Sequence, residues 1–303
     1  MTEFRSGFVC LVGRPNTGKS TLTNALVGSK VAITSSRPQT TRHTIRGIVH
    51  RDDFQLILVD TPGLHRPRTL LGKRLNDLVR NTYAGVDAIG LCIPADEAIG
   101  PGDRWIVEQI RSIAPTTTLV GVVTKIDKVA KDKLAAQLAA VGELLGLTDG
   151  HQAEIVPVSA VTGEQIDVVI DVLAAALPPG PAYYPDGELT DEPEEVLMAE
   201  FIREAALEGV HDELPHSLAV AIDEVNPREG RDDLIDVRAI LYVERDSQKG
   251  IVIGKGGARL REVGTAARGQ IEKLLGAKVY LELRVKVAKN WQRDSKQLGR
   301  LGF

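Results

Sequence analysis

Short apolar runs separated by helical patterns make up the first half of the chain. Four of these runs are almost uninterrupted and end at polar or glycine-containing turns, which predicts buried strands over 8–12, 54–59, 119–123 and 155–158. Helical segments lie between them, and the last covers 164–177. Strands alternating with helices through short loops predict an α/β domain with a mostly parallel sheet and helices on both faces. Functional residues of such a sheet gather at the carboxyl ends of its strands.

A stretch rich in proline and glycine then interrupts the alternation. It begins with the string PPGP at 178–181 and continues to Pro193, and such a composition cannot continue a helix. Beyond it, 234–244 and 278–287 alternate like half-buried strands around the helical segment 258–275. We therefore expect three parts: a first domain over 1–178, a linker over 179–193 and a second, α+β domain over 194–303.

The loop after the first strand matches the phosphate-binding pattern G-x4-G-K-[ST]. Its glycines let backbone N–H groups face a β-phosphate, and the helix that starts at its end adds partial positive charge. Lys19 is expected to reach the β- and γ-phosphates and the Ser20 hydroxyl to bind Mg²⁺. The residues expected to contact the nucleotide are Gly13, Asn16, Thr17, Gly18, Lys19, Ser20 and Thr21.

The second strand ends in Asp60-Thr61-Pro62-Gly63. A carboxylate at this strand end faces the phosphate loop, where Asp60 is expected to support the nucleotide-bound Mg²⁺. The Gly63 N–H is expected to contact a γ-phosphate and to move away when that phosphate is lost. A tight turn without any such role is the alternative, since Pro and Gly occur in turns generally.

The third strand ends in Thr124-Lys125-Ile126-Asp127, which resembles the guanine-specificity motif N-K-x-D of GTPases. The Asp127 carboxylate can accept from guanine N1–H and the exocyclic amine together, and Lys125 would pack along the base. Thr124 departs from the pattern, and its missing amide is expected to weaken the ties to the base and to the phosphate loop. Ser159-Ala160 after the fourth strand resembles the loop whose backbone contacts the guanine carbonyl.

These motifs, in this order, resemble the bacterial translation-factor-related GTPases. In that family a Thr of switch I binds Mg²⁺, a position best matched by Thr41, with Thr40 as the alternative. Leu64 stands where related proteins place a water-orienting Gln, so slow hydrolysis is expected. Asn16 resembles the Asn that helps to hold K⁺ in some of these GTPases, although Asn also favours turns. The expected catalytic residues are therefore Lys19, Thr41, Gly63 and Asn16.

The second domain contains the string Gly254-Lys255-Gly256-Gly257, which resembles the GXXG loop of KH domains. An extra helix at 193–209 and an extra strand at 218–225 precede it, which matches the type II arrangement. Residues 245–303 hold fourteen Lys or Arg against five Asp or Glu, an excess of nine that favours a polyanionic partner. The residues expected to contact RNA are Ile253, Gly254, Lys255, Gly256, Gly257 and Arg259.

A GTPase domain, a linker and a KH domain, together with Ala288-Lys289-Asn290-Trp291, resemble the Era-like family of bacterial GTPases over essentially the whole chain. The resemblance implies a protein that binds and hydrolyses GTP, uses GTP/GDP and Mg²⁺, binds the 3′ end of small-subunit ribosomal RNA and assists small-subunit assembly. We expect a cytoplasmic monomer, with peripheral contact at the inner face of the cell membrane left open. A P-loop ATPase and an RNA-binding protein with a relic P-loop domain are the alternatives.

The sequence argues against a disulfide-rich protein, a membrane-spanning protein and a histidine metal site. Aromatic residues make up only 4% of the chain, so the cores should consist mainly of aliphatic side chains. The sequence shows no disulfide framework, and Cys10 and Cys92 lie in apolar contexts that predict buried, reduced thiols. Neither a signal peptide nor a membrane-spanning run is expected. The six His residues lack metal-ligand spacing.

Overall fold

The computed structural model describes residues 3–34, 44–62, 69–147, 153–208 and 214–301. Contacts divide the chain into two compact units, one made mainly of residues up to Asp191 and the other mainly of residues from Glu192 onward. Each unit has its own sheet and its own hydrophobic core. No helix in the described ranges is both long enough and apolar enough to cross a bilayer.

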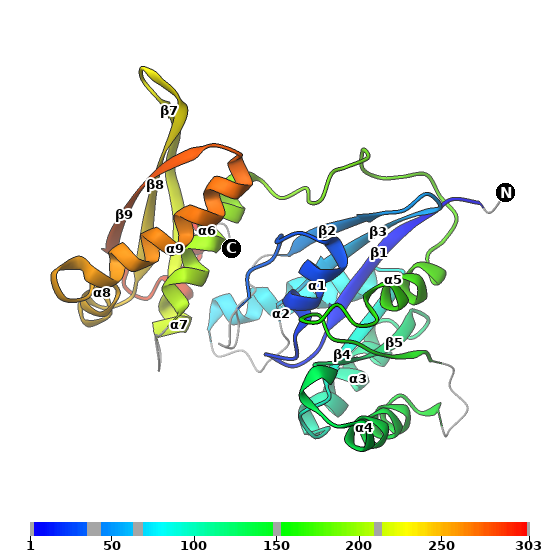
Figure 1. Cartoon of the computed structure of the whole chain (residues 1–303). Coiled ribbons are helices and arrows are strands. Elements are labelled where there is room, and N and C mark those ends of the chain that lie inside the picture. The colour runs from blue at the N-terminus through cyan, green and yellow to red at the C-terminus, as the bar shows by residue number, and fades with distance from the viewer. Residues whose placement is uncertain (1–2, 35–43, 63–68, 148–152, 209–213, 302–303) are drawn as a thin grey trace. The chain divides into compact units, whose positions relative to one another are not determined.

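The first unit contains a six-stranded sheet with the order β2-β3-β1-β4-β5-β6 (Figure 1). All neighbours pair in parallel except β2, which runs antiparallel to β3 at the edge. This is the mostly parallel sheet that the alternating pattern predicts. The strands are β1 (Arg5–Val12), β2 (Ile45–His50), β3 (Phe54–Asp60), β4 (Ala88–Pro94), β5 (Thr118–Thr124) and β6 (Ile155–Pro157).

Helices cover both faces of this sheet. Alternate residues of β1 point to opposite sides, so Val9 and Leu11 pack with α1 and α5, whereas Cys10 and Val12 pack with α2, α3 and α4. The helices are α1 (Lys19–Val27), α2 (Leu70–Ala84), α3 (Pro101–Ile113), α4 (Lys131–Leu144) and α5 (Ile166–Ala175), with a short 3-10 turn η1 (Ile126–Lys128). Cys10 and Cys92 are fully buried and not disulfide-bonded, as expected.

The proline-rich stretch after α5 lies along the first unit as an extended strap, which we define as residues 178–191. The fully buried Gln55 side chain accepts hydrogen bonds from the Tyr183 and Tyr184 N–H groups and donates one to the Tyr184 carbonyl. The Ile48 N–H donates to the Leu189 carbonyl at 2.9 Å. Most of the expected linker is therefore attached to β2 and β3.

The second unit contains a three-stranded sheet with the order β7-β8-β9, in which β8 pairs antiparallel with β7 and parallel with β9. Its core joins Phe201 and Ile202 of α6 to Val237 of β8 and Ile271 of α9. The elements are α6 (Glu194–Leu207), α7 (Leu214–Ser217), β7 (Ala219–Arg228), β8 (Arg231–Val243), α8 (Asp246–Ile253), η3 (Lys255–Gly257), α9 (Ala258–Leu275), β9 (Lys278–Val287), η4 (Trp291–Arg293) and α10 (Ser295–Arg300).

Candidate functional site

The phosphate-binding loop connects β1 to α1 and has the backbone conformation that its glycines permit. Gly18 and Asn16 have φ angles of 93° and 64°, in the left-handed region. A Cβ on Gly13 would lie 2.6 Å from the Cys92 carbonyl oxygen, so only glycine fits there. The Thr17 hydroxyl donates to the Arg14 carbonyl at 3.0 Å and closes the loop. The loop is thus built by local geometry, as the sequence predicts.

Lys19 is buried within this loop. Its ammonium donates to the carbonyls of Gly13 at 3.0 Å and Arg14 at 2.8 Å. Burial lowers the pKa of Lys19, although the nearby Asp60 carboxylate opposes that shift. A cation held at the loop by backbone carbonyls is placed to pair with phosphate oxygens.

Ser20 and Asp60 come together at the ends of α1 and β3. The Ser20 hydroxyl donates to Asp60 Oδ2 at 2.8 Å, and Asp60 is fully buried. A hydroxyl and a carboxylate side by side next to the phosphate loop form the oxygen donor set that Mg²⁺ prefers, so these residues fit the metal. Bound there, Mg²⁺ would neutralise charge on the nucleotide phosphates.

Thr124 makes a contact with the phosphate loop. Its hydroxyl donates to the Thr17 carbonyl at 2.6 Å, and the residue is buried. One tie between the base-binding loop and the phosphate loop is therefore present without the Asn amide, and a weaker hold on guanine stays a prediction. A hydroxyl on β5 reaches the carbonyl because β1 and β5 flank β4 in the sheet.

Asp127 lies exposed on the turn after β5, where its carboxylate is available to a base. The Ser159 hydroxyl donates to Asp127 Oδ1 at 2.6 Å and accepts from the Thr162 N–H at 3.2 Å. Lys125 precedes it with a left-handed φ of 59°. The loop that begins Ser159-Ala160 thus orients the carboxylate expected to read guanine.

In the second unit, the glycine loop joins α8 to α9. Gly254, Gly256 and Gly257 all have positive φ angles, between 60° and 78°, and Lys255 between them is exposed. A Cβ on Gly254 would lie 2.7 Å from the Arg259 Cβ, whereas the space around Gly256 and Gly257 is open. The loop therefore presents bare backbone and one cation at its surface.

A groove runs from this loop between α9 and β9. Most of the residues that line the groove have small, basic or apolar side chains. They are Gly257, Leu260, Arg261, Gly264, Thr265, Arg268, Tyr280, Leu281 and Leu283. The Arg228 guanidinium lies 4.5 Å from the centre of the Tyr280 ring. Glycines, an aromatic ring and arginines side by side suit a nucleic-acid strand.

Comparisons with known proteins agree with both halves of this arrangement. Residues 8–125 match the family described as 50S ribosome-binding GTPase, and residues 213–292 match the KH domain family. GTPase Era from Mycobacterium avium (strain 104) is 88% identical over 303 residues and covers 100% of both chains. GTPase Era from Mycolicibacterium smegmatis (strain ATCC 700084 / mc(2)155) is 82% identical with the same coverage.

The chain belongs to the Era GTPase family. Two solved Era structures superpose on 99% of it. One is Era in complex with MgGDPNP and nucleotides 1506–1542 of 16S ribosomal RNA, with 35% identity and a TM-score of 0.92. The other is a variant of Aquifex aeolicus Era bound to GDP and AlF4⁻, with 34% identity and a TM-score of 0.93.

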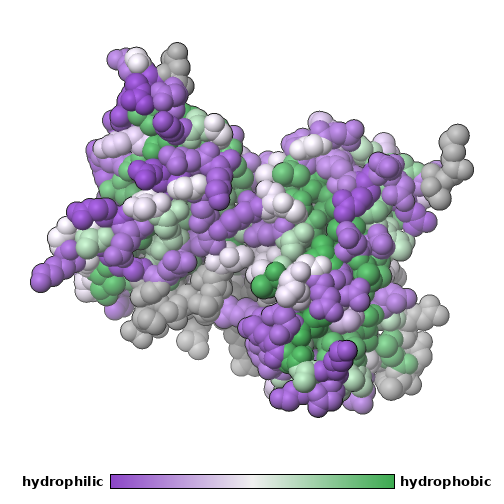
Figure 2. Space-filling view, viewed as in Figure 1, coloured by the Kyte–Doolittle hydropathy of each residue, from purple (hydrophilic) through white to green (hydrophobic). Residues whose placement is uncertain are grey.

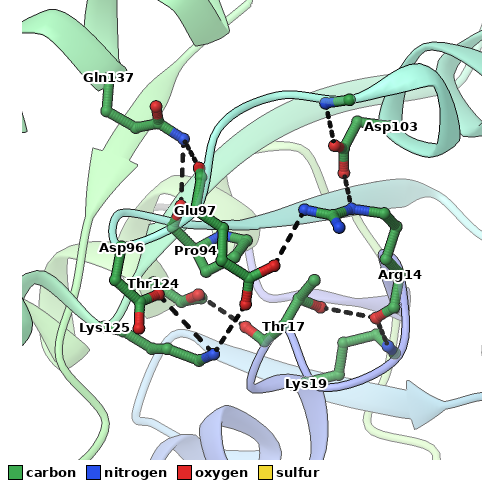
Figure 3. Close-up of polar contacts among 11 residues, drawn as sticks. Arg14, Thr17, Lys19, Pro94, Asp96, Glu97, Asp103, Thr124, Lys125 and Gln137 are labelled. Atoms are coloured by element: carbon green, nitrogen blue, oxygen red, sulfur yellow. Dashed lines mark hydrogen bonds and ion pairs between the residues drawn. The ribbon is translucent and has the colours of Figure 1, made fainter. Parts of the chain in front are cut away.

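Arg14 of the phosphate loop pairs with two carboxylates that the Era-family motifs do not include. The Arg14 guanidinium donates to Asp103 at 2.8 Å and to Glu97 at 3.2 Å (Figure 3). Burial by itself lowers the pKa of the Arg14 guanidinium. The neighbouring carboxylates of Asp103 and Glu97 have the larger combined effect, so the pKa of Arg14 is raised. No motif identifies these carboxylates, because only the parallel pairing of β1 with β4 places them beside the loop.

Arg259 has contacts that differ from those expected. Its guanidinium donates to the main-chain carbonyls of Ala206 and Glu208 and so ties the start of α9 to the end of α6. Ile253 is partly buried and packs against the core of the second unit. Both residues therefore support the glycine loop within the unit, and their contact with RNA stays a prediction. Arg261 and Arg268 line the groove beside the loop, and no motif in the sequence identifies them. Thr40, Thr41, Gly63 and Leu64 lie outside the described residues.

Proposed function

We propose that this protein is a GTP-hydrolysing switch that binds the 3′ region of small-subunit ribosomal RNA and assists assembly of the small ribosomal subunit. The observation that carries the proposal is the presence, in one chain, of a guanine-nucleotide site and a KH glycine loop. Similarity over 99% of the chain to an Era structure with MgGDPNP and 16S ribosomal RNA supports it.

At the nucleotide site, residues of this chain bind the phosphates and orient the base. The Gly13–Ser20 backbone receives the phosphates, Lys19 pairs with their charge, and Ser20 and Asp60 hold Mg²⁺. Asp127, oriented by the 2.6 Å hydrogen bond from Ser159, accepts from the two donors of guanine. Adenine lacks that donor pair, so the geometry favours GTP over ATP.

Hydrolysis would depend on the positions of Thr41 and Gly63, and the potassium role of Asn16 stays a proposal. Asn16 has a left-handed φ of 64°, which supports its turn role directly. Comparing hydrolysis rates in K⁺ and Na⁺ tests the ion: higher turnover in K⁺ supports it, and equal rates with an unaffected Asn16→Ala variant reject it.

For RNA, we propose that the glycine loop receives the sugar-phosphate backbone while bases enter the groove between α9 and β9. Lys255, Arg261 and Arg268 supply positive charge, and Tyr280 offers a ring for stacking. Hydrophilic residues predominate on the visible face over α8 and α9, with a few apolar residues between them (Figure 2). A cytoplasmic monomer fits a ribosomal RNA partner, and membrane contact stays an expectation from the sequence.

Two experiments test the proposal. Competition of GTP and ATP for bound labelled GDP should show displacement by GTP alone, and equal displacement by ATP would support the ATPase alternative. Crosslinking to RNA followed by sequencing should recover the 3′ region of small-subunit ribosomal RNA. A Lys19→Ala variant with unchanged function in the cell would support the relic interpretation instead.

A further inference from the structure

The loop between β4 and α3 contains two carboxylates beside the nucleotide motifs, and one of them, Glu97, contacts both motifs. Glu97 Oε2 accepts from Arg14 of the phosphate loop at 3.2 Å, and Glu97 Oε1 lies 3.6 Å from the Lys125 ammonium. Asp96 Oδ1 lies 3.8 Å from the same ammonium (Figure 3). One carboxylate thus bridges a cation beside the phosphates to a cation beside the base.

The backbone of this loop is itself held in place. The Gln137 amide of α4 donates to the carbonyls of Pro94 and Glu97, both at 3.0 Å (Figure 3). The Ala95 N–H donates to the Thr124 carbonyl at 2.8 Å. Strand β5 and helix α4 therefore hold the backbone of the loop from which both carboxylates project.

Two links now join the phosphate loop to the base-binding loop. The first is the buried hydrogen bond from Thr124 to Thr17. The second is the Arg14–Glu97–Lys125 bridge, whose members are 22% to 42% exposed. Charges at this exposure attract each other modestly and are screened by salt. Without Glu97, Arg14 would keep its pair with Asp103 and Lys125 its pair with Asp96, but the charged link between the two cations would be lost.

We propose that Glu97, assisted by Asp96, is a positioning residue that holds Arg14 and Lys125 in the nucleotide-ready arrangement and thereby slows nucleotide release. The proposal rests on the proposed function, in which Lys125 packs along the guanine base. It goes beyond the family motifs, none of which includes this loop.

The test uses the full chain and fluorescent GDP and GTP. Glu97→Gln removes the two partly exposed ion pairs of this carboxylate and should speed release of both nucleotides about two- to fivefold. Glu97→Asp, which keeps the charge, should restore part of the slow release. Glu108→Gln, an exposed carboxylate of α3 on the same unit, is the matched control and should release nucleotide at the wild-type rate.

Salt separates an electrostatic role from a packing role. The wild-type release rate should rise with ionic strength, and the Glu97→Gln rate should depend on it less. Wild-type release by Glu97→Gln, or an equal effect in Glu108→Gln, would overturn the proposal. Failure of the wild-type chain to bind guanine nucleotides would instead reject the proposed function.

Discussion

At the residue scale, we expect the choice of base to depend on Asp127. Its carboxylate is exposed and is oriented by the Ser159 hydroxyl, which approaches to 2.6 Å. That hydroxyl can donate equally well to an amide oxygen, so an Asn at this position keeps the support. The chemistry of the group, rather than its placement, would then decide which base is bound.

We expect Asp127→Asn to move nucleotide preference from guanine toward xanthine. The amide N–H₂ can donate to the xanthine carbonyl, whereas it meets a donor on guanine. Binding of GTP and XTP, measured side by side for both proteins, checks this. An unchanged ratio would mean that Asp127 does not face the base.

The two cysteines make a residue-scale prediction about pH. Burial raises the pKa of both Cys10 and Cys92 from 9.0 to about 12. Because the thiolate is the nucleophile that attacks a thiol reagent, both residues should be almost unreactive in the folded protein near pH 8 and should react on unfolding. Counting reactive thiols with a chromogenic disulfide before and after denaturation measures this.

The raised pKa values of the two thiols also make the free energy of unfolding depend on pH. Folding favours the protonated thiols, so their contribution is complete below pH 9 and is lost as the pH rises toward 12. The free energy of unfolding should therefore fall across that range. A Cys10→Ala, Cys92→Ala double variant should lose less stability between pH 9 and pH 12 than the wild type, and an equal loss would contradict the assignment.

At the element scale, the strap runs along β2 and β3 of the first unit and continues into the chain that enters α6. Arg46 of β2 pairs with Asp191 at 2.6 Å, and His50 of β2 contacts the Glu188 carbonyl at 2.9 Å. Since β2 follows the expected switch I in the sequence, we propose that a shift of that strand would be passed to the strap. This gives a physical route for nucleotide-dependent coupling.

Gln55→Ala should release the strap, because three hydrogen bonds to its backbone depend on this one buried amide. Leaving the Tyr183 and Tyr184 groups without that partner should cost about 1–3 kcal/mol. Limited proteolysis should then cut between residues 178 and 191 faster than in the wild type. Arg51→Ala, which removes an exposed pair with Asp167, is the control and should be cut as slowly as the wild type.

The sequence pattern did not predict strands β2 and β4, and each of them contains a glycine that packing requires. Gly90 interrupts the apolar run of β4, and Gly47 interrupts β2. A Cβ at Gly47 would lie 2.6 Å from Val27, and one at Gly90 would lie 2.7 Å from Leu11. Packing against neighbouring elements requires these glycines, although glycine weakens a strand when the sequence is considered alone.

At the scale of the whole molecule, the nucleotide and RNA activities should separate by mutation. Gly257→Asp is the preferred variant, since Asp tolerates a left-handed φ and the space around Gly257 is open. The added carboxylate should repel RNA phosphates and weaken binding of a 3′-end oligonucleotide at least tenfold, about 1.4 kcal/mol, while GDP affinity stays the same.

Gly276→Asp provides the matched control, because Gly276 has a φ of 62° and open space at the other end of α9. It should bind RNA like the wild type. RNA affinity should also fall as salt rises. Equal RNA affinity with GDP and with a GTP analogue would leave the RNA site intact but reject coupling through the strap.

The sequence alone determined the features that depend on local geometry. The pattern G-x4-G-K-[ST] between a strand and a helix predicts a phosphate loop, so the path from Gly13 to Ser20, the turn to Asp127 and the Gly254–Gly257 loop could all be placed by spacing. Helix α9 and strand β9 were likewise predicted with their observed bounds, because the periodicities of 258–275 and 278–287 are uninterrupted.

Tertiary structure alone decided which distant residues meet. The hydroxyl of Thr124 replaces an amide because β5 ends opposite Thr17, and Arg14 meets Glu97 and Asp103 because β1 pairs with β4. Arg259 supports α6, while Arg261 and Arg268 line the groove, because the packing of α9 sets which of its sides faces each neighbour. Such contacts join residues 53 to 107 positions apart, and no local pattern encodes them, since they follow from how the sheets and helices pack.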